Sequence, residues 1–404
     1  MTKKLTNQQI IVMVTFLTCA LLLLIVLVGK SQLLHEKQKK ESIKVGFLYD
    51  GDESTPYTYN FIRSQSDVEL QFGARVTTVV RSNVTVEDCE TMLNELIDEG
   101  CDLIFCNSYG FGETTKKLAV QHPDIQFCQA TCDNANTEPV VSNYHTFMGE
   151  IYEGRYLAGV VAGMKLKEMI DNDEITEREA VVGYVAAFPY AEVISGYTAF
   201  FMGVRREVPT ATMRVKYTNS WSNYNLEKEY ASQMIEEGCV LISQHSDTNG
   251  PAVACEESGK NVFHVGYNKS MLDVAPTTSL VSCRINWTPY MTAAVSAVLD
   301  GEKIENETGG HVHGNDVGAG LKDNWVQILD RNTLIVTEKT EEKLQSLITE
   351  MENHTINVYY GNYTGTDPYD PTDTIDLTQP YQENENASAP SFHYVLDDVI
   401  IVED

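Results

Sequence analysis

Polar and aromatic side chains follow most of the apolar, strand-like runs of this sequence. Aromatic rings at such positions can stack on a flat ring, and carboxylate and amide groups can hydrogen-bond to its polar atoms. This combination favours a flat polar ring that carries a sugar over an inorganic ion. The side chains concerned are Tyr49, Asp50, Asn107, Ser108, Tyr109, Phe188, Asn219, Trp221, Gln244, His245, Asp247, Tyr267 and Asn268.

Catalysis is a second chemistry that two of these residues suggest. His245 and Asp247 lie close together in the sequence and are side chains that exchange protons with substrates in enzymes. No serine or cysteine nucleophile with a fixed partner accompanies them. We therefore expect a ligand hydrogen bond or a domain-closing contact from this pair, and a binding protein in place of an enzyme.

Metal binding is a third chemistry to consider. His311 and His313 have a metal-like spacing, but they lie in a glycine-rich stretch without an identifiable third ligand. Asp367, Asp370 and Asp373 are spaced like part of a calcium loop, but the glycine and the terminal glutamate of such a loop are missing. We therefore expect no metal and no cofactor, a solvated loop at the histidines, and a surface excursion at the aspartates.

The segments that must position these side chains alternate between strand-like and helix-like patterns. Apolar strand-like runs at 43–50, 101–108 and 125–130 are separated by helical stretches, and the pattern restarts at 179–189. Repeated βαβ units of this kind predict an α/β protein with mostly parallel sheets covered by helices. A helix at 149–168 connects the two halves. Ligands bind at the carboxyl ends of the strands in open α/β sheets, so two facing halves predict a cleft.

The charge balance argues against one class of partner. The 404 residues include 29 lysines and arginines against 58 aspartates and glutamates, and seven of the lysines lie within residues 1–44. The acidic remainder of the chain would repel nucleic acid, so we expect no nucleic-acid partner. The chain is also too long for one typical hydrophobic core, which predicts two domains.

Residues 10–29 form an uncharged apolar run that is long enough to cross a bilayer as a helix. A cleavable signal peptide is the alternative, but the run is long and no small-x-small site follows it before Lys30. We therefore expect an uncleaved single-pass anchor, a short tail at 1–9 and a polar linker at 30–42. Lysines flank both sides of the run, so their count does not orient the chain.

Longer segments carry a resemblance to a known family. They include KVGFLYDG from Lys44, YEGRYLAGVVAGM from Tyr152 and QHSDTNGP from Gln244. With them the chain resembles the basic membrane protein family of ABC-transporter substrate-binding proteins, which includes purine nucleoside receptors. The resemblance implies a type I periplasmic-binding-protein fold, with two Rossmann-like lobes of parallel sheet joined by three hinge crossings. It places the first lobe at 43–168 and about 286–318, and the second at 169–285 and about 319–404.

The resemblance also implies a function. Members of the family capture a small molecule, such as a purine nucleoside or nucleobase, in the interlobe cleft and deliver it to an ABC permease. The body would then lie outside the cytoplasm, held at the cell membrane by residues 10–29. A ligand-sensing module of a signalling system is the alternative, and an uncleaved anchor favours it slightly.

Five residues match positions that contact the base in nucleoside-binding members. By this resemblance, Asp50 would grip the base and Tyr59 would stack on it, followed by Asn60. Asn107 and Ser108 would provide further contacts to the base.

Two departures from the family pattern concern the ribose. Asn268 stands where the family has an acid, and the segment that ends in Trp287 stands where it has a lysine. The ligand could therefore be a free base or a modified nucleoside as well as an ordinary nucleoside. The complete predicted ligand-binding set is Asp50, Tyr59, Asn60, Asn107, Ser108, Tyr109, Phe188, Trp221, His245, Asp247, Asn268 and Trp287.

Overall fold

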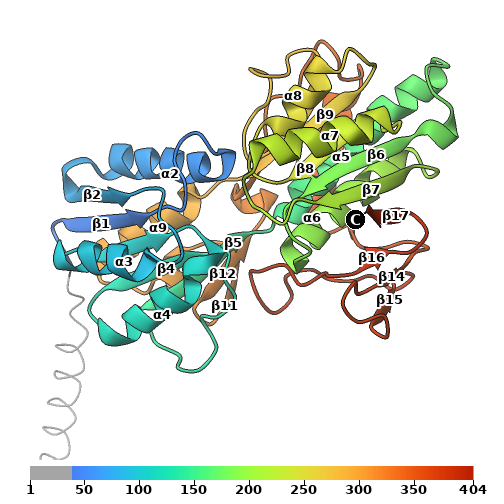
Figure 1. Ribbon diagram of the computed structural model, residues 1–404. Coiled ribbons are helices and arrows are strands. Elements are labelled where there is room, and N and C mark those ends of the chain that lie inside the picture. Colours follow the sequence, from blue (N-terminus) through green and yellow to red (C-terminus); the bar gives the residue numbers. More distant parts are fainter. Residues whose placement is uncertain (1–38, 404) are drawn as a thin grey trace, which may run out of the picture.

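The computed structural model describes residues 39–403, which form two lobes side by side (Figure 1). Each lobe contains a seven-stranded sheet covered by helices. The predicted α/β fold with two mostly parallel sheets is therefore confirmed. The predicted tail at 1–9 and anchor at 10–29 lie outside the described residues, as does most of the linker at 30–42. Among residues 39–403, no helix combines the length and the apolar character needed to cross a bilayer.

The sheet of the first lobe is parallel except at one edge. Its strands run in the order β11 (His311–His313), β12 (Asp316–Ala319), β5 (Tyr144–Gly149), β4 (Gln126–Ala130), β3 (Leu103–Cys106), β1 (Ile43–Leu48) and β2 (Val76–Arg81). Only β11 is antiparallel to its neighbour. Helices α2 (Pro56–Phe72) and α9 (Thr288–Asp300), the latter followed by α10 (Ile304–Glu307), cover one face, and α3 (Cys89–Asp98) and α4 (Gly112–Gln121) cover the other. Buried apolar strands such as β3 are typical of a sheet covered on both faces.

The sheet of the second lobe follows the same plan. Its strands run in the order β13 (Val326–Ile328), β10 (Ser279–Ile285), β9 (Phe263–Tyr267), β8 (Leu241–His245), β6 (Val181–Ala186), β7 (Thr212–Tyr217) and β17 (Ile400–Glu403), and only β13 is antiparallel. Helices α5 (Ile151–Asp171) and α6 (Ala191–Glu207) pack on one face, and α7 (Tyr224–Glu236) and α8 (Gly250–Glu257) on the other. Helix α11 (Thr340–Glu352) packs against α5.

Helix α5 packs with the second sheet, although the predicted lobe boundary at 168/169 placed it in the first lobe. It contacts α6 along its length and also touches β10 and β13. Two glycines allow the helices to approach closely: a Cβ on Gly159 would lie 1.9 Å from the carbonyl oxygen of Phe200, and one on Gly203 would lie 2.2 Å from that of Tyr156. The boundary therefore lies near Glu150.

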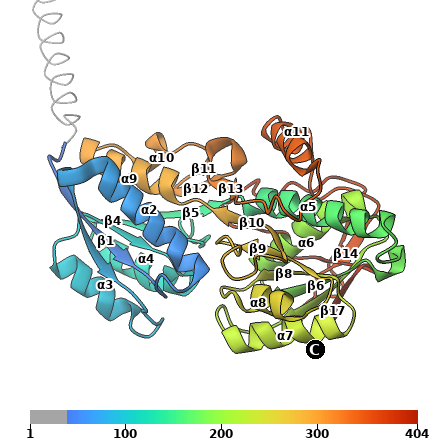
Figure 2. The ribbon, with the colours of Figure 1, turned by 90° about the horizontal axis from the view of Figure 1, so that it is seen from above.

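The chain crosses between the lobes three times, in agreement with the predicted hinge (Figure 2). The crossings lie at Glu150 between β5 and α5, after Ile285 between β10 and α9, and at 320–325 between β12 and β13. They are hydrogen-bonded to one another, because Glu150 N donates to Ala319 O at 2.9 Å and Asn286 N donates to Trp325 O at 2.6 Å. The hinge is thus one connected backbone unit.

A buried carboxyl group stands at this hinge. Glu153, in the first turn of α5, accepts a hydrogen bond at Oε2 from the backbone N–H of Leu321, at 2.7 Å. Burial raises the pKa of Glu153 to about 7, and the nearby Glu150 carboxylate acts in the same direction. Since the unfolded-state pKa is near that of an ordinary glutamate, the native state loses stability as the pH rises from about 4.5 to about 7.

Substitution Glu153→Gln should remove this loss, because glutamine keeps an oxygen acceptor for Leu321 N–H and carries no charge. We expect the variant to be more stable than the native protein above pH 7, by about 3 kcal/mol, and to differ little from it near pH 4.5. Urea unfolding followed by circular dichroism at both pH values measures this. Glu168→Gln, on the same helix and more exposed, is the matched control. An equal effect of Glu153→Gln at both pH values would contradict the argument.

The C-terminal segment, residues 357–396, is attached to both lobes. It contains a small sheet of β14 (Thr364–Thr366), β15 (Thr374–Asp376) and β16 (Val395–Leu396). In the first lobe, Asp316 accepts hydrogen bonds from Ser388 N and Oγ, both at 2.6 Å. In the second lobe, Ser195 Oγ of α6 donates to Glu383 at 2.8 Å. The stretch predicted as a surface excursion is therefore part of a segment that packs on both lobes.

Candidate ligand-binding site

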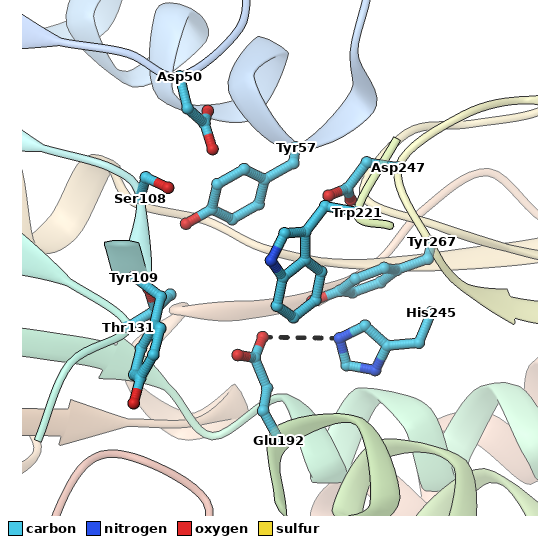
Figure 3. Close-up of a pocket in the computed structure, with 10 residues that line it drawn as sticks. All are labelled: Asp50, Tyr57, Ser108, Tyr109, Thr131, Glu192, Trp221, His245, Asp247 and Tyr267. Atoms are coloured by element: carbon cyan, nitrogen blue, oxygen red, sulfur yellow. Dashed lines mark ion pairs between the residues drawn. The ribbon is translucent and has the colours of Figure 1, made fainter. Parts of the chain in front are cut away.

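A pocket lies between the lobes at the carboxyl ends of the strands, where the sequence predicts a cleft (Figure 3). It contains about 400 Å³ of empty space, including the part that is open to solvent. Both lobes contribute to its walls. The lining residues are Asp50, Tyr57, Ser108, Tyr109 and Thr131 from the first lobe, and Glu192, Trp221, His245, Asp247 and Tyr267 from the second.

Asp50 is held in position by the polar groups around it. It lies two residues after the end of β1, and its Oδ1 accepts hydrogen bonds from Asn107 Nδ2 at 2.9 Å and from the Thr58 hydroxyl at 3.1 Å. Its backbone N–H donates to Asn107 Oδ1 at 3.0 Å. Asn107 is itself buried at the end of β3. The neighbouring strand ends thereby fix one carboxylate at the pocket wall.

Tyr57 is the aromatic side chain that the first turn of α2 places in the pocket (Figure 3). Its hydroxyl donates to the carbonyl oxygen of Asn107. Its ring packs edge-on against Phe61, with 5.1 Å between ring centroids, and against Trp287 at 6.5 Å. Burial raises the pKa of Tyr57 well above its ordinary value, and the Asp50 carboxylate adds to this. The side chain is therefore a fixed neutral phenol.

Trp221 is the large aromatic side chain on the opposite wall (Figure 3). It lies in the loop after β7 and packs against two aromatic neighbours. The ring of Phe188 lies 5.2 Å away and that of Tyr190 lies 6.2 Å away, and Phe188 and Tyr190 stack on each other at 5.1 Å. These neighbours hold the indole at the pocket and leave surface free for a flat ligand.

His245 contributes a neutral imidazole. Burial, together with the guanidinium of Arg155, lowers the pKa of His245 to about 4, although Glu192 acts in the opposite direction. His245 Nε2 lies 3.5 Å from Glu192 Oε1, so this contact is between a neutral ring and a carboxylate at neutral pH. Arg155 lies behind the wall, with its guanidinium 3.5 Å from the ring centroid of Tyr267 and a hydrogen bond to Gln244 O at 2.8 Å.

Three carboxyl groups give the pocket its electrostatic character: Asp50, Glu192 and Asp247. Burial raises the pKa of Asp247 well above its ordinary value, and the Asp50, Glu227 and Glu192 carboxylates contribute to the same effect. Within the described part of the chain, no lysine or arginine lines this pocket. The pocket is therefore built for a ligand that donates hydrogen bonds and carries no negative charge.

One group of side chains comes close to a metal-binding arrangement, away from this pocket. Ligand atoms of Asp367, Asp373 and His393 lie within 4.8 Å of one another. His393 Nε2 lies 3.3 Å from Asp373 Oδ2 and 4.0 Å from Asp367 Oδ2. This geometry is also that of a protonated imidazole between two carboxylates. The pair His311 and His313 lies on β11, where His311 Nδ1 contacts Glu150 Oε1 at 2.8 Å.

Comparison with known families decides what kind of protein this is. The sequence profile of the family described as ABC transporter substrate-binding protein PnrA-like, or Bmp, matches residues 42–360. The chain belongs to this Bmp family. It is an ABC-transporter solute-binding protein.

Two relatives and one solved structure illustrate the similarity. A purine-binding protein of Brucella abortus (strain 2308) is 29% identical over 264 residues, covering 65% of this chain and 70% of that protein. A Haloferax volcanii protein whose name carries a provisional glucose-binding assignment is 27% identical, covering 75% of this chain and 72% of its own. A solute-binding protein from Conexibacter woesei has a TM-score of 0.62 at 15% identity, covering 78% of this chain and 98% of that one, which supports the fold alone.

Six of the twelve residues predicted for this Bmp protein line the pocket. They are Asp50, Ser108, Tyr109, Trp221, His245 and Asp247. Phe188 and Asn107 stand directly behind lining residues, as described for Trp221 and Asp50. The stacking role predicted for Tyr59 falls on a residue outside the pocket, because Tyr57 faces it from the same helix. The ring of Tyr59 instead lies under the ammonium group of Lys269, which is 4.8 Å from its centroid.

Trp287 is buried in the core of the first lobe and does not line the pocket. Its ring stacks on Phe61 with 4.4 Å between centroids, and Phe147 packs edge-on against it at 5.4 Å. The residue follows β10 by two positions, which is where a strand-end rule predicts a cleft residue. The chain has already crossed back to the first lobe at this point, so the side chain packs beneath α2.

Asn60 and Asn268 join the two lobes beside the pocket. Asn60 Nδ2 donates to Asn268 Oδ1 at 3.2 Å, and Arg284 donates to Asn60 Oδ1 at 3.2 Å. Asn268 Nδ2 also lies 3.4 Å from Asp247 Oδ1. The position where the family has a ribose-binding acid thus contributes an interlobe contact here.

Four lining residues were missing from the predicted set: Tyr57, Thr131, Glu192 and Tyr267. Thr131 and Tyr267 follow or end strands, so the same strand-end signal applies to them. Tyr57 and Glu192 lie in the first turns of α2 and α6. Which side chain of a first turn faces a cleft depends on the path of the preceding loop, and the sequence pattern does not report that path.

Proposed function

We propose that this Bmp protein captures a purine base or nucleoside between its lobes and delivers it to an ABC permease. The observation that carries the proposal is the pocket itself, in which Tyr57 and Trp221 enter from opposite lobes beside three carboxyl groups. The similarity to the purine-binding protein of Brucella abortus supports the same ligand class. We further propose that residues 10–29 anchor the protein in the cell membrane, with the body outside the cytoplasm.

The chemistry of the pocket favours a purine over other flat molecules. A purine offers two faces for stacking on aromatic side chains and ring or exocyclic N–H groups that carboxylates accept. The Asp50 and Glu192 carboxylates would repel a phosphate group placed between them. Phosphorylated purines are therefore disfavoured.

Closure of the lobes around the ligand accounts for delivery. A ligand that touches Asp50 and Tyr57 on one side and Trp221 and Asp247 on the other stabilises the closed arrangement, because only that arrangement makes both sets of contacts. The permease would then bind the closed form preferentially.

A panel of related compounds tests the ligand class. The melting temperature of the purified protein is expected to rise with millimolar adenine, guanine or adenosine, because a ligand that binds only the folded state stabilises it. Adenosine monophosphate should raise it far less than adenosine. Glucose is the control that the Haloferax relative suggests. No shift with any purine, or a shift with glucose alone, would refute the proposal.

A further inference from the structure

A second cavity opens outward from the pocket, and we call it the outer chamber. It contains about 1150 Å³ of empty space, including the part that is open to solvent. It shares Tyr109, Thr131, Glu192 and Trp221 with the pocket. Because these residues line both spaces, a ligand in the pocket can extend an arm into the chamber without crossing a wall.

The outer wall of the chamber comes from the C-terminal segment. Asp367, Tyr369, Pro390 and His393 line it from this side, and all four lie beyond residue 360, where the match to the family profile ends. The buried carboxylate of Glu383 fixes this wall by accepting hydrogen bonds from the segment as well as from α6. This wall of the chamber therefore comes from residues beyond the part of the chain that matches the family profile.

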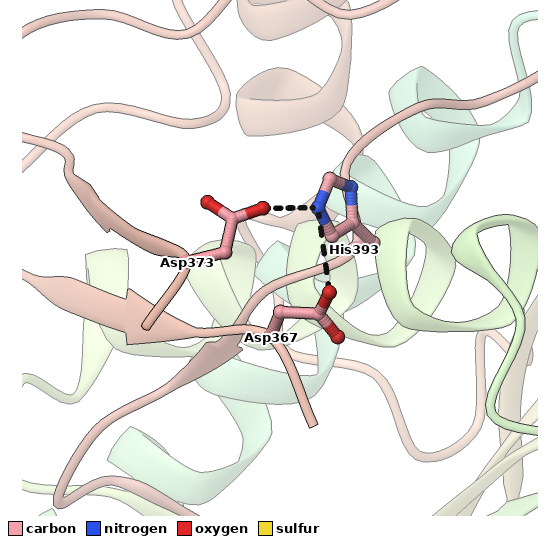
Figure 4. Close-up of side chains that lie close together, drawn as sticks. All are labelled: Asp367, Asp373 and His393. Atoms are coloured by element: carbon pink, nitrogen blue, oxygen red, sulfur yellow. Dashed lines mark hydrogen bonds and ion pairs between the residues drawn. The ribbon is translucent and has the colours of Figure 1, made fainter. Parts of the chain in front are cut away.

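His393 is held in one orientation within this wall (Figure 4). Its Nδ1 lies 2.7 Å from the carbonyl oxygen of Ser391, which can only accept, so Nδ1 carries the proton of that bond. Its Nε2 faces Asp373 and Asp367. Burial alone would lower the pKa of His393, but hydrogen bonds to Ser391 and Asp373 outweigh this effect and raise the pKa. With the ring protonated, the two carboxylates still leave one net negative charge at the wall.

The lining of the chamber combines aromatic faces with carboxylates. Tyr109, Tyr190 and Trp221 line it from the lobes, and Tyr369, a residue that is 70% exposed, lines it from the C-terminal segment. The carboxyl groups that line the chamber belong to Asp133, Glu192 and Asp367. Within the described residues, His393 is the one basic side chain among those that line the chamber. Aromatic faces beside carboxylates are the chemistry that binds organic cations.

We infer that the outer chamber is a subsite for a positively charged arm, so that the full ligand is a purine-like ring bearing an ammonium or similar cationic group. This inference rests on the proposed function, because the ring occupies the inner pocket. It narrows the ligand class from neutral purines to purine derivatives with a cationic substituent. Anionic substituents are excluded by the same carboxylates.

Matched synthetic ligands test the inference. Adenine is compared with derivatives that carry an aminobutyl or a pentyl arm, attached either at the exocyclic amine or at the ring nitrogen that bears the sugar in nucleosides. The two arms have similar length and differ in charge. We expect titration calorimetry on the full-length protein to show that, at one of the two attachment points, the aminobutyl compound binds at least tenfold more tightly than the pentyl compound. This ratio should fall as salt is added.

Variants locate the effect in the chamber. Asp367→Asn and Tyr369→Ala are each expected to lower the aminobutyl-to-pentyl affinity ratio at least threefold, whereas Asp370→Asn, an exposed change on the same segment, should leave it unchanged. An aminobutyl-to-pentyl affinity ratio near one in the native protein would overturn the inference, and so would a ratio that neither variant changes. In both cases the proposed function stands as long as adenine binds. Absence of adenine binding would overturn the proposed function and this inference with it.

Discussion

Replacement of Trp221 by alanine is expected to weaken purine binding by between about tenfold and a hundredfold. Stacking of a base on an aromatic side chain contributes about 1–3 kcal/mol, and each 1.4 kcal/mol is about a tenfold change in the dissociation constant. Trp221 is the largest aromatic side chain that lines the pocket. Its neighbours Phe188 and Tyr190 already hold it at the pocket wall, so the indole side chain loses little conformational entropy when the ligand binds.

Two measurements separate lost binding from lost folding in this variant. Calorimetric titration gives the affinity, and thermal unfolding without ligand gives the stability, which should change little because Trp221 is only partly buried in a loop. Tyr224→Ala removes the aromatic ring of a 41% exposed residue that does not line the pocket and serves as the control. Native affinity in the Trp221 variant would remove this residue from the site and with it the two-sided stacking arrangement.

Alanine at Gly159 is expected to cause the largest loss of stability of any substitution considered. Its Cβ would lie 1.9 Å from the carbonyl oxygen of Phe200, which is backbone and cannot rotate away. Helices α5 and α6 would have to separate along a fully buried contact. Overpacking in cores costs typically 1–3 kcal/mol, and a backbone clash of this kind should reach about 3 kcal/mol or more.

A graded series tests this explanation. A Cβ at Gly163 would lie 2.7 Å from the carbonyl oxygen of Val204, so Gly163→Ala should destabilise less than Gly159→Ala. Lys167→Ala, on an exposed part of the same helix, should have little effect. Urea unfolding gives the order directly. Equal stability of the Gly159 and Lys167 variants would show that the two helices can move apart without cost.

The strand ends were the part of the site that the sequence could predict. Asp50, Ser108 and His245 end or follow strands of the parallel sheets, and the carboxyl ends of such strands meet at one edge. A residue at the carboxyl end of a predicted strand is therefore expected at this edge of the sheet, beside the pocket. Trp287 breaks the rule because the strand before it leads into a hinge crossing, so its side chain packs in the other lobe.

Two features needed the three-dimensional structure. The sequence predicts a helix at 149–168 that connects the two halves, but the lobe it packs with depends on the close approach of Gly159 to Phe200, which involves residues distant in the sequence. The C-terminal segment has short strands, many turns and no helical or strand periodicity. Its position follows from single buried carboxylates, Asp316 and Glu383, whose partners a periodic pattern does not reveal.

The two attachments of the C-terminal segment also limit how far the protein can open. Ser388 is fixed to Asp316 of one lobe and Glu383 to Ser195 of the other, and five residues of extended chain span at most roughly 18 Å. This short tether sets a maximum separation for the attached points, whatever the three crossings would allow. While both attachments hold, ligand exchange takes place through a gap of restricted width, and the open and closed arrangements differ by a small rotation.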